Sequence, residues 1–313
     1  MIKNAFIVGS GRSGTTLLGD ILDLHPSICC WYEPYFILDR YFRSAPNDCR
    51  VAKEANDNVK RHIKKAFDHY RHRRKCQTVV DKSPRNSLKI PFLLEIFPKA
   101  KFIHMVRDGR DVTLSIYKEW QKRQEILQNR NFFQALQRIR KFLARQPLLE
   151  HKFAAIMFEM GDFKNLFRRN LVFQRYKRWE GRIGWGPRFE GWQTVIDRVS
   201  TLEFSALQWA KCLEAIVTAR IKIESDRFLE IRYEDFLKQP KKILKGIFEF
   251  LAVPFPSGFM DLMPPLKVSN YDKWRHAFSA QQKERMGPIL QPLLLQFGYA
   301  KGSSWYQKAD SIL

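Results

Sequence analysis

The chain opens on a short run of apolar residues, and the spacing of apolar positions then changes from that of a strand to that of a helix. Residues 5–8 read Ala-Phe-Ile-Val, which predicts a buried strand. Residues 9–14 are rich in glycine and serine, and apolar residues then recur at helical spacing at Leu17, Leu18, Ile21 and Leu22. A strand, a turn and a helix in this order form half of a βαβ unit.

Strands and helices continue to alternate along the rest of the chain. Helical periodicity is present at 53–75, 207–219, 240–251 and 280–297. Runs typical of strands occupy 78–80, 101–106 and 228–232. Polar residues follow the first two of these strands, as they do where parallel strands open onto a ligand crevice. We therefore predict an α/β fold with a mainly parallel central sheet flanked by helices.

The pattern changes between residues 118 and 200, where the expected helices are strongly basic and aromatic. This segment carries 18 Lys and Arg against 8 Asp and Glu, and its second half interleaves arginines with Phe, Tyr and Trp. The aromatic side chains would pack inward as the core of a cap, form an acceptor-binding lid, or do both. We expect a single domain over residues 1–313, with 118–200 as a helical insert that caps the acceptor.

Net charge and cysteine content narrow the classes of partner. The 313 residues carry a formal charge of +23, so we expect anionic partners: a nucleotide, a nucleic acid, a sulfated or phosphorylated substrate, or a membrane surface. The five cysteines include no C-x-x-C pair, which predicts neither a disulfide framework nor a zinc site. This favours a reducing compartment. Since no apolar run reaches the ~18 residues of a membrane span, we expect a cytoplasmic protein.

Residues 9–16, Gly-Ser-Gly-Arg-Ser-Gly-Thr-Thr, have the G-x-x-x-x-G frame of a phosphate-binding loop between a strand and a helix. Backbone N–H groups at the start of a helix bind an anion whatever the side chains are. Thr15 stands where nucleoside triphosphatases have a lysine, so no cation there reaches a β,γ-phosphate pair. Arg12 lies inside the loop instead, which suits a single terminal phosphate and its leaving group. A purely structural turn is the alternative.

This loop resembles the 5′-phosphosulfate loop of sulfotransferases that use 3′-phosphoadenylyl sulfate (PAPS), in the variant that reads Arg-Ser-Gly-Thr-Thr. A second motif, at 107–115, looks like the 3′-phosphate site of that family, because Arg107 and Ser115 lie eight residues apart as the family's Arg and Ser do. Arg107 would offer a planar fork to a dianionic phosphate. An ion pair of Arg107 with Asp108 or Asp111 is the alternative. The resemblance implies donor contacts from Gly11, Arg12, Ser13, Gly14, Thr15, Thr16, Arg107 and Ser115.

Two shorter segments extend the resemblance. Tyr233, in Arg-Tyr-Glu-Asp-Phe after a strand, resembles the family's Tyr-Glu segment near the nucleotide, and a structural role for it is equally well supported. Lys273, in Lys-Trp, is similar to a late loop of tyrosylprotein sulfotransferases that closes over the cofactor with a Lys. The resemblance implies a P-loop-like fold, PAPS as donor, 3′-phosphoadenosine 5′-phosphate (PAP) as product, and no metal.

The resemblance also implies which groups act at the acceptor. Glu33 lies where tyrosylprotein and several bacterial sulfotransferases place a catalytic Glu, 21 residues after Arg12. Beside Trp31 and Tyr32 its carboxylate would be partly desolvated and its pKa raised, as a general base requires. Lys82 resembles the Lys of the family's Asn-Lys-Asp-Pro segment and would stabilise the sulfuryl or leaving group together with Arg12.

Each of these roles has a plainer alternative. Glu33 could cap a helix or pair with Arg40 or Arg43, and Lys82 could pair with Asp81 or another neighbour. Two histidines compete with Glu33 as the base, since cytosolic small-molecule sulfotransferases use a His. They are His25, which precedes a proline at a helix end, and His104, which lies in the middle of a strand. We expect both to be structural for these reasons.

These features together predict an enzyme that transfers a sulfuryl group from PAPS to an acceptor hydroxyl. A nucleotide kinase-like enzyme is disfavoured by Thr15, and a non-catalytic binder of nucleic acid or anionic polymer would not need the ordered motifs. The basic and aromatic composition of 118–200 suits a carbohydrate or glycolipid acceptor. A peptide tyrosine and a small alcohol or phenol are the alternative acceptors. No specific nucleic acid is expected, the basic surface leaves a peripheral membrane contact open, and the oligomeric state is not predicted.

Overall fold

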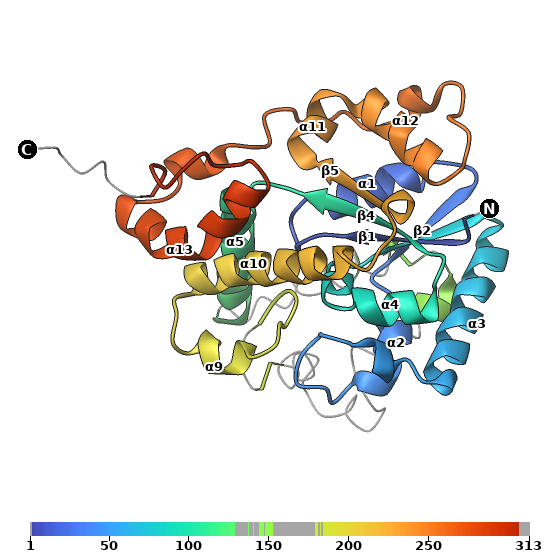
Figure 1. Ribbon diagram of the computed structural model, residues 1–313, viewed down its shortest axis with the longest axis horizontal. Helices are drawn as coiled ribbons and strands as arrows, with labels where there is room; N and C mark the ends of the chain where they lie inside the picture. The colour runs from blue at the N-terminus through green and yellow to red at the C-terminus, as the bar shows by residue number, and fades with distance from the viewer. Residues whose placement is uncertain are drawn as a thin grey trace, which may run out of the picture.

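The structure of this protein is a computed structural model that describes residues 2–128, 137, 140, 144–146, 148–152, 179–180, 182 and 184–306 (Figure 1). Within these residues, five strands form one parallel sheet in the order β2-β3-β1-β4-β5. This confirms the predicted α/β class and its parallel sheet. The strands are β1 (Asn4–Val8), β2 (Ile28–Tyr32), β3 (Thr78–Lys82), β4 (Lys101–Val106) and β5 (Phe228–Arg232).

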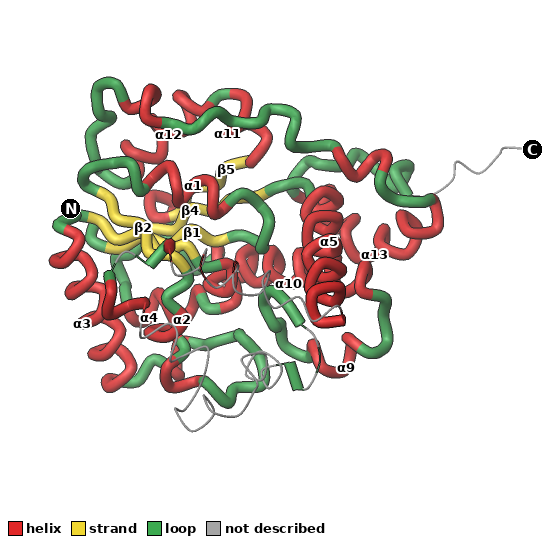
Figure 2. The backbone as a smooth tube through the Cα atoms, turned by 180° about the vertical axis from the view of Figure 1, so that it is seen from behind, coloured by secondary structure: helices red, strands yellow, loops and turns green. Residues whose placement is uncertain are grey.

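Helices cover both faces of the sheet (Figures 1 and 2). Strand β1 shows the cause, because alternate side chains of a strand point to opposite faces. Ala5 and Ile7 join an apolar cluster with helices of one face, whereas Phe6 and Val8 join a second cluster with helices of the other. The first face carries α1 (Thr15–Leu22), α11 (Tyr233–Lys238) and α12 (Pro240–Phe250), and the second carries α2 (Tyr35–Leu38), α3 (Asp57–Arg74) and α4 (Ile90–Ile96).

A third apolar cluster lies beside the sheet, in a lobe of helices. Tryptophan side chains from several of its elements, among them Trp120 and Trp209, are buried in it. The helices of this lobe are α5 (Gly109–Gln128), α9 (Trp192–Ile196), α10 (Thr201–Arg220) and α13 (Ala280–Gln296). Among the helices that the structure describes, none has the length and apolarity needed to cross a membrane.

About half of the predicted insert at 118–200 lies outside the described residues. Its first part continues helix α5, which runs through residue 118 without a break. Four of the aromatic residues singled out from sequence lie outside the described residues: Phe163, Phe167, Phe173 and Tyr176. Among the described ones, Trp179, Phe189 and Trp192 are buried, whereas Trp185 is partly exposed.

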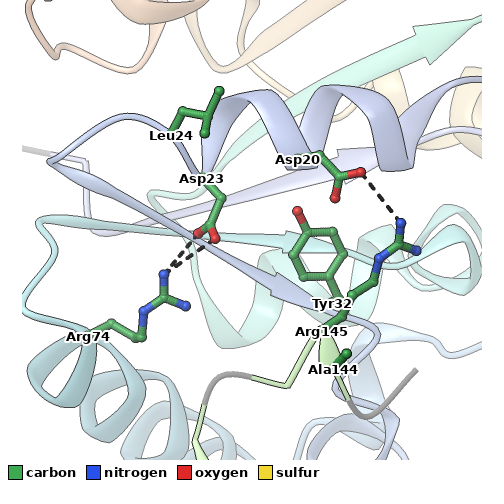
Figure 3. Close-up of a pocket in the computed structure, with 7 residues that line it drawn as sticks. All are labelled: Asp20, Asp23, Leu24, Tyr32, Arg74, Ala144 and Arg145. Atoms are coloured by element: carbon green, nitrogen blue, oxygen red, sulfur yellow. Dashed lines mark hydrogen bonds and ion pairs between the residues drawn. The ribbon is translucent and has the colours of Figure 1, made fainter. Parts of the chain in front are cut away.

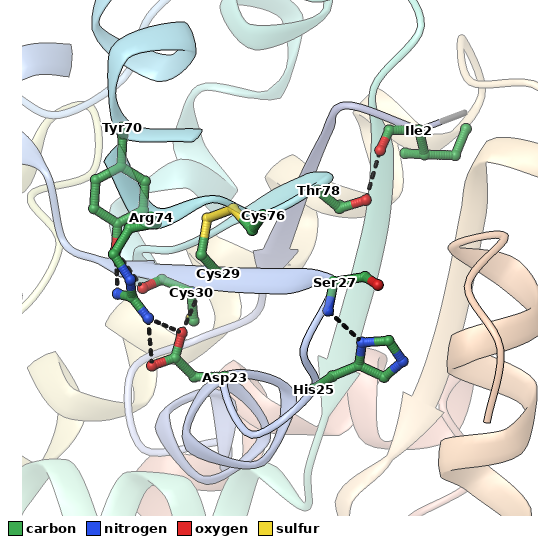
Figure 4. The surroundings of a disulfide bond; sticks show 10 residues. All are labelled: Ile2, Asp23, His25, Ser27, Cys29, Cys30, Tyr70, Arg74, Cys76 and Thr78. Atoms are coloured by element: carbon green, nitrogen blue, oxygen red, sulfur yellow. Dashed lines mark hydrogen bonds and ion pairs between the residues drawn. A yellow bond between two sulfur atoms is a disulfide. The ribbon is translucent and has the colours of Figure 1, made fainter. Parts of the chain in front are cut away.

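The expectation that the cysteines form no disulfide was wrong. Cys29 on β2 and Cys76, two residues before β3, form a disulfide across 47 residues, with their Cα atoms 5.8 Å apart (Figure 4). The two strands are hydrogen-bonded neighbours, and Cys29 pairs with Val79 in their register. The sheet therefore brings together two cysteines whose spacing along the chain carries no signal of pairing.

Candidate active site

The polar residues singled out by sequence follow the carboxyl ends of the strands, which meet at one edge of the parallel sheet. The phosphate loop, residues 9–14, follows the central strand β1. Glu33 follows β2 and Lys82 ends β3, on one side of the loop. Arg107 follows β4 and Tyr233 follows β5, on the other side. The order of the strands thus divides the site into two halves around the loop.

Residues from neighbouring segments hold the loop in place through its glycines. Gly9 exchanges two 2.9 Å hydrogen bonds with the Ser87 hydroxyl, which accepts from its N–H and donates to its carbonyl. A Cβ on Gly9 would lie 2.6 Å from the carbonyl oxygen of Met105. Gly14 caps α1 with a φ of 95°, and a Cβ there would lie 2.3 Å from Cδ2 of Tyr233. Residues with a side chain would displace the loop at both positions.

Two buried polar groups of the site have no hydrogen-bond partner within the described residues. They are the hydroxyl of Ser13, inside the loop, and Nε of Arg107. Buried polar atoms are rarely left unpaired in native proteins, because their desolvation costs free energy. Ser13 lies next to the backbone N–H groups that begin α1, so an anion bound there would supply the missing acceptor.

Arg107 is held rigidly at the loop. Its guanidinium donates to the carbonyl oxygens of Arg12 at 3.2 Å and Asn270 at 2.7 Å, and it stacks on the Tyr233 ring at 4.4 Å. The carboxylate of Asp111 lies 3.9 Å from it, although the pair is buried rather than on the surface. The geometry leaves Arg107 beside the loop with its fork preorganised for an anion.

Arg12 connects the loop to the second motif. Its Nε donates to the Ser115 hydroxyl at 3.0 Å, so the loop cation and the serine of 107–115 are in direct contact. Arg12 and Glu33 both have left-handed backbone conformations, with φ of 72° and 50°. Such conformations are unfavourable for residues other than glycine and concentrate at functional sites.

Glu33 and Lys82 form an ion pair on the other side of the loop. Lys82 Nζ donates to Glu33 Oε1 at 2.8 Å, and the Glu33 N–H donates to the Lys82 carbonyl at 3.1 Å. The Lys82 side chain is 3% exposed and that of Glu33 is 32% exposed, so the pair has a buried cation and an accessible carboxylate. Asp81, the partner considered for Lys82 from sequence, is instead fully buried and accepts from the Ser83 hydroxyl at 2.6 Å.

A late loop closes the Arg107 half of the site. Asn270 accepts from Arg107 and Lys273 through its two oxygens, and its side-chain amide donates to the Tyr233 hydroxyl at 2.8 Å. The Asp111 carboxylate accepts from the N–H groups of Asp272 at 2.6 Å and Trp274 at 3.0 Å. Tyr233 and Lys273 are therefore brought together with Arg107.

Sequence reasoning missed Asn270, Asp111 and Ser87 as supports of the site. Asp111 lies inside the 107–115 motif and Asn270 lies three residues before Lys273, so their places beside the predicted residues were the available signals. Ser87 gave no signal, since only the fold brings it to Gly9. The two histidines have structural contacts: His25 Nε2 lies 2.8 Å from the Pro254 carbonyl, and His104 Nδ1 lies 3.1 Å from Glu230.

A pocket of about 300 Å³ lies beside the Glu33–Lys82 half (Figure 3). Two ion pairs line it, between Arg74 and Asp23 and between Arg145 and Asp20, at 3.2 and 3.5 Å. The Tyr32 ring forms a wall of this pocket and lies 6.0 Å from Lys82 Nζ. Burial raises the pKa of the Tyr32 phenol, so it stays neutral.

Comparison with known sequences supports one family. The model described as the sulfotransferase family matches residues 4–160 and 172–257. Protein-tyrosine sulfotransferase 1 of Danio rerio is 21% identical over 326 residues, which cover 94% of this chain and 71% of the relative. Protein-tyrosine sulfotransferase of Drosophila melanogaster is 33% identical over 122 residues, 36% of this chain and 24% of the relative. An omega-hydroxy-beta-dihydromenaquinone-9 sulfotransferase of Mycobacterium bovis is 40% identical over 77 residues, 25% of this chain and 17% of the relative.

Solved structures agree on the fold. The sulfotransferase domain of the Synechococcus PCC 7002 olefin synthase superposes with a TM-score of 0.53 at 18% identity, over 96% of each chain. The sulfotransferase domain of the curacin biosynthetic pathway gives a TM-score of 0.54 at 16% identity, over 96% of this chain and 99% of the other. At these identities the likeness concerns the fold alone.

Proposed function

Since this chain belongs to the sulfotransferase family, we propose that it transfers a sulfuryl group from PAPS to a hydroxyl group of an acceptor. One observation carries the proposal: at the carboxyl edge of the sheet, the phosphate loop lies between the Glu33–Lys82 pair and the Arg107 cluster. This arrangement suits a nucleotide donor held on one side of the loop and an acceptor that approaches from the other.

The residues on the nucleotide side fit an anionic donor. The buried Ser13 hydroxyl and Arg107 Nε, unpartnered in the described part of the chain, are donors that a phosphate would satisfy. In the proposal, the residues from Gly11 to Thr16 hold the 5′-phosphosulfate, and Arg107 and Ser115 hold the 3′-phosphate. Tyr233 and Lys273 cover the nucleotide. When bound, PAPS supplies the sulfuryl group and a phosphate leaving group.

The chain's own residues then account for the proton and the charge. Glu33 takes the proton of the acceptor hydroxyl, since its carboxylate is the accessible member of the ion pair. Lys82 orients that carboxylate and keeps a buried cation beside the transferred group. Arg12 stabilises negative charge on the leaving oxygen. A sulfuryl group carries less charge than a phosphoryl group, so these cations suffice without a metal ion in the proposal.

The acceptor is proposed more broadly. A hydroxyl on a carbohydrate or glycolipid is our first candidate, from the composition of 118–200, which caps the acceptor in this proposal. A peptide tyrosine is the second candidate, because two of the relatives above are named protein-tyrosine sulfotransferases. The Cys29–Cys76 disulfide contradicts the cysteine argument for a reducing compartment, so the expected cytoplasmic location does not restrict the acceptor.

Calorimetric titration tests the donor half of the proposal. We expect tight, metal-independent binding of PAP, and weaker binding of ATP or GTP with Mg²⁺. Transfer is then followed with labelled PAPS and sugar, peptide and phenol acceptors. Preference for a triphosphate with Mg²⁺ would contradict the proposal. Binding that favours anionic polymers and falls steeply with salt would instead support a non-catalytic binder.

A further inference from the structure

Trp185 lies against the phosphate loop, although it comes from a different part of the chain. A Cβ built on Gly11 would lie 3.2 Å from Cη2 and 3.7 Å from Cζ3 of Trp185, so the six-membered end of the indole packs on the Gly11 backbone. Gly11 is buried and is followed by the exposed Arg12. The indole therefore contacts the residue that precedes Arg12, which we assign to the leaving oxygen.

A buried glutamine fixes the segment that carries this indole. Gln208 of α10 is 1% exposed and donates to the carbonyls of Trp185 at 2.7 Å and Pro187 at 3.0 Å. Its side-chain oxygen accepts from the Trp120 indole at 3.1 Å. Gly186 has a φ of 85°, and a Cβ there would lie 2.8 Å from the Gln208 amide nitrogen. The segment at 184–187 can approach Gln208 closely only because residue 186 is glycine.

The indole is placed to contact a ligand as well as the loop. Trp179, Phe189 and Trp192, the neighbouring aromatic residues, are buried in the third apolar cluster, whereas Trp185 is partly exposed at its border. The guanidinium of Arg123, which also pairs with Glu119 at 3.0 Å, lies 5.8 Å from the Trp185 ring. A rigid, partly exposed aromatic ring beside a phosphate loop presents an apolar surface, and here a guanidinium lies over that ring.

We infer that Trp185 is a platform on which the acceptor stacks, and that the acceptor hydroxyl is carried by a ring. The inference rests on the proposed function and deepens it by naming the acceptor chemistry. A sugar ring and a phenol ring share this chemistry, since both offer a flat face to an indole. Contact with Gly11, one residue before Arg12, brings the stacked ring to the loop that holds the 5′-phosphosulfate in the proposal. Trp185 thus positions the acceptor and takes no proton.

Two variants separate stacking from simple filling of space. Trp185→Phe keeps an aromatic ring, whereas Trp185→Leu keeps an apolar side chain without one. Binding of three probes to the protein–PAP complex is measured by calorimetry: methyl β-glucoside, a tyrosine-containing peptide and 1-hexanol. Whichever ring probe the wild type binds, the Leu variant should bind it about 5- to 20-fold more weakly than the wild type does. The Phe variant should bind the same probe with most of the wild-type affinity. Hexanol should bind weakly and equally to all three proteins.

Comparing the affinity for methyl β-glucoside with that for the tyrosine peptide shows whether the acceptor ring is a sugar or a phenol. Quenching of tryptophan fluorescence by the bound probe gives a second readout, which should fall in the Phe variant because Trp185 is the residue in contact. PAP affinity and thermal midpoint verify that both variants fold with an intact donor site.

The outcomes distinguish this inference from the proposed function. If PAP binds but no ring probe binds, or if ring binding is equal in the wild type and the Leu variant, the platform is wrong and the donor proposal survives. If PAP fails to bind, the proposed function is wrong. Ring binding to the free protein that depends on Trp185 would still support the platform.

Discussion

Lys82 Nζ lies 2.8 Å from Glu33 Oε1, and the two residues are 49 positions apart in the sequence. The register of β2 and β3 explains the contact, because Tyr32 pairs with Lys82 and Glu33 follows at the carboxyl end. Glu33 also leaves the strand with a φ of 50°, a conformation that the neighbouring backbone hydrogen bond to Lys82 stabilises. The pair exists only when the two strands are aligned.

Replacing Glu33 tests its role as the base. Glu33→Gln keeps the shape of the side chain and removes the proton acceptor, so kcat should fall by roughly 10²-fold or more. PAP affinity should stay within about twofold, since the Arg107 half of the site is unchanged. Steady-state kinetics and calorimetry measure the two effects. Glu249→Gln, at an exposed position of α12, is the matched control, and unchanged turnover in the Glu33 variant would remove it from the role.

Arg107→Ala should weaken nucleotide binding more than it changes the chemical step. The variant loses the guanidinium that stacks on Tyr233 and donates to the loop and to Asn270. We expect PAP to bind at least about tenfold more weakly, and the preference for PAP over adenosine 5′-monophosphate to disappear. Lys241→Ala removes an exposed cation elsewhere and should change neither value. Retained discrimination between the two nucleotides would show that the 3′-phosphate lies elsewhere.

A pair of glycine substitutions tests the loop. Gly14→Ala adds a Cβ where φ is 95° and the Tyr233 ring would be 2.3 Å away. We therefore expect both the free energy of unfolding and the free energy of PAP binding to weaken by about 1–3 kcal/mol. Gly246→Ala, within α12, meets nothing within 4 Å and should stabilise the protein by about 0.5–1 kcal/mol. Urea denaturation and PAP titration compare the two. A Gly14 variant with wild-type PAP affinity would contradict the geometry of the loop.

Asp111 should act on the nucleotide through the late loop. Asp111→Asn leaves one acceptor oxygen where two N–H groups, of Asp272 and Trp274, are bound. The loop with Lys273 and Asn270 should loosen, and PAP affinity should fall by about 5- to 30-fold. Asp261→Asn, at an exposed position, serves as the control. Equal affinities in both variants would mean that the loop does not cover the nucleotide.

Buried Asp81 predicts a pH dependence of stability. Burial raises its pKa from the ordinary 3.8 to about 7, against the opposing hydrogen bond from Ser83. Between the unfolded-state pKa and the folded-state pKa of Asp81, the unfolded protein binds fewer protons than the folded protein. The contribution of Asp81 to stability therefore falls as pH rises from about 4 to about 7, and then stays level.

Asp81→Asn removes this titration. Relative to the wild type, the free energy of unfolding of the variant should increase by roughly 2–4 kcal/mol between pH 4.5 and pH 8. Urea midpoints at these two pH values measure the difference. A constant difference between the two proteins at both pH values would show that Asp81 is ionised in the folded state throughout.

Four strands of the parallel sheet and most of its helices could be predicted from the sequence, because their signals are local; β2, which precedes Glu33, was not among them. Residues 5–8 are apolar in succession as a strand buried on both faces requires, and helix α3 shows its buried face in Val59, Ile63, Phe67 and Tyr70. The loop at 9–14 is likewise contiguous, since adjacent backbone N–H groups form its proposed anion site, and the 107–115 motif lies within one strand end and the helix that follows it.

Contacts between distant segments were decided by the tertiary structure alone. The Cys29–Cys76 disulfide, the partner of Lys82 and the place of Trp185 on Gly11 each depend on which strands are neighbours and on how closely helices pack against them. The local spacing of apolar residues does not encode which distant segments come into contact. The sequence by itself therefore determined most of the elements, the phosphate loop and the residue types of the site, while the order of five parallel strands decided which of those residues meet. The physical reason is that hydrophobic periodicity fixes the face that a segment buries, whereas its partner is selected by packing of the whole core.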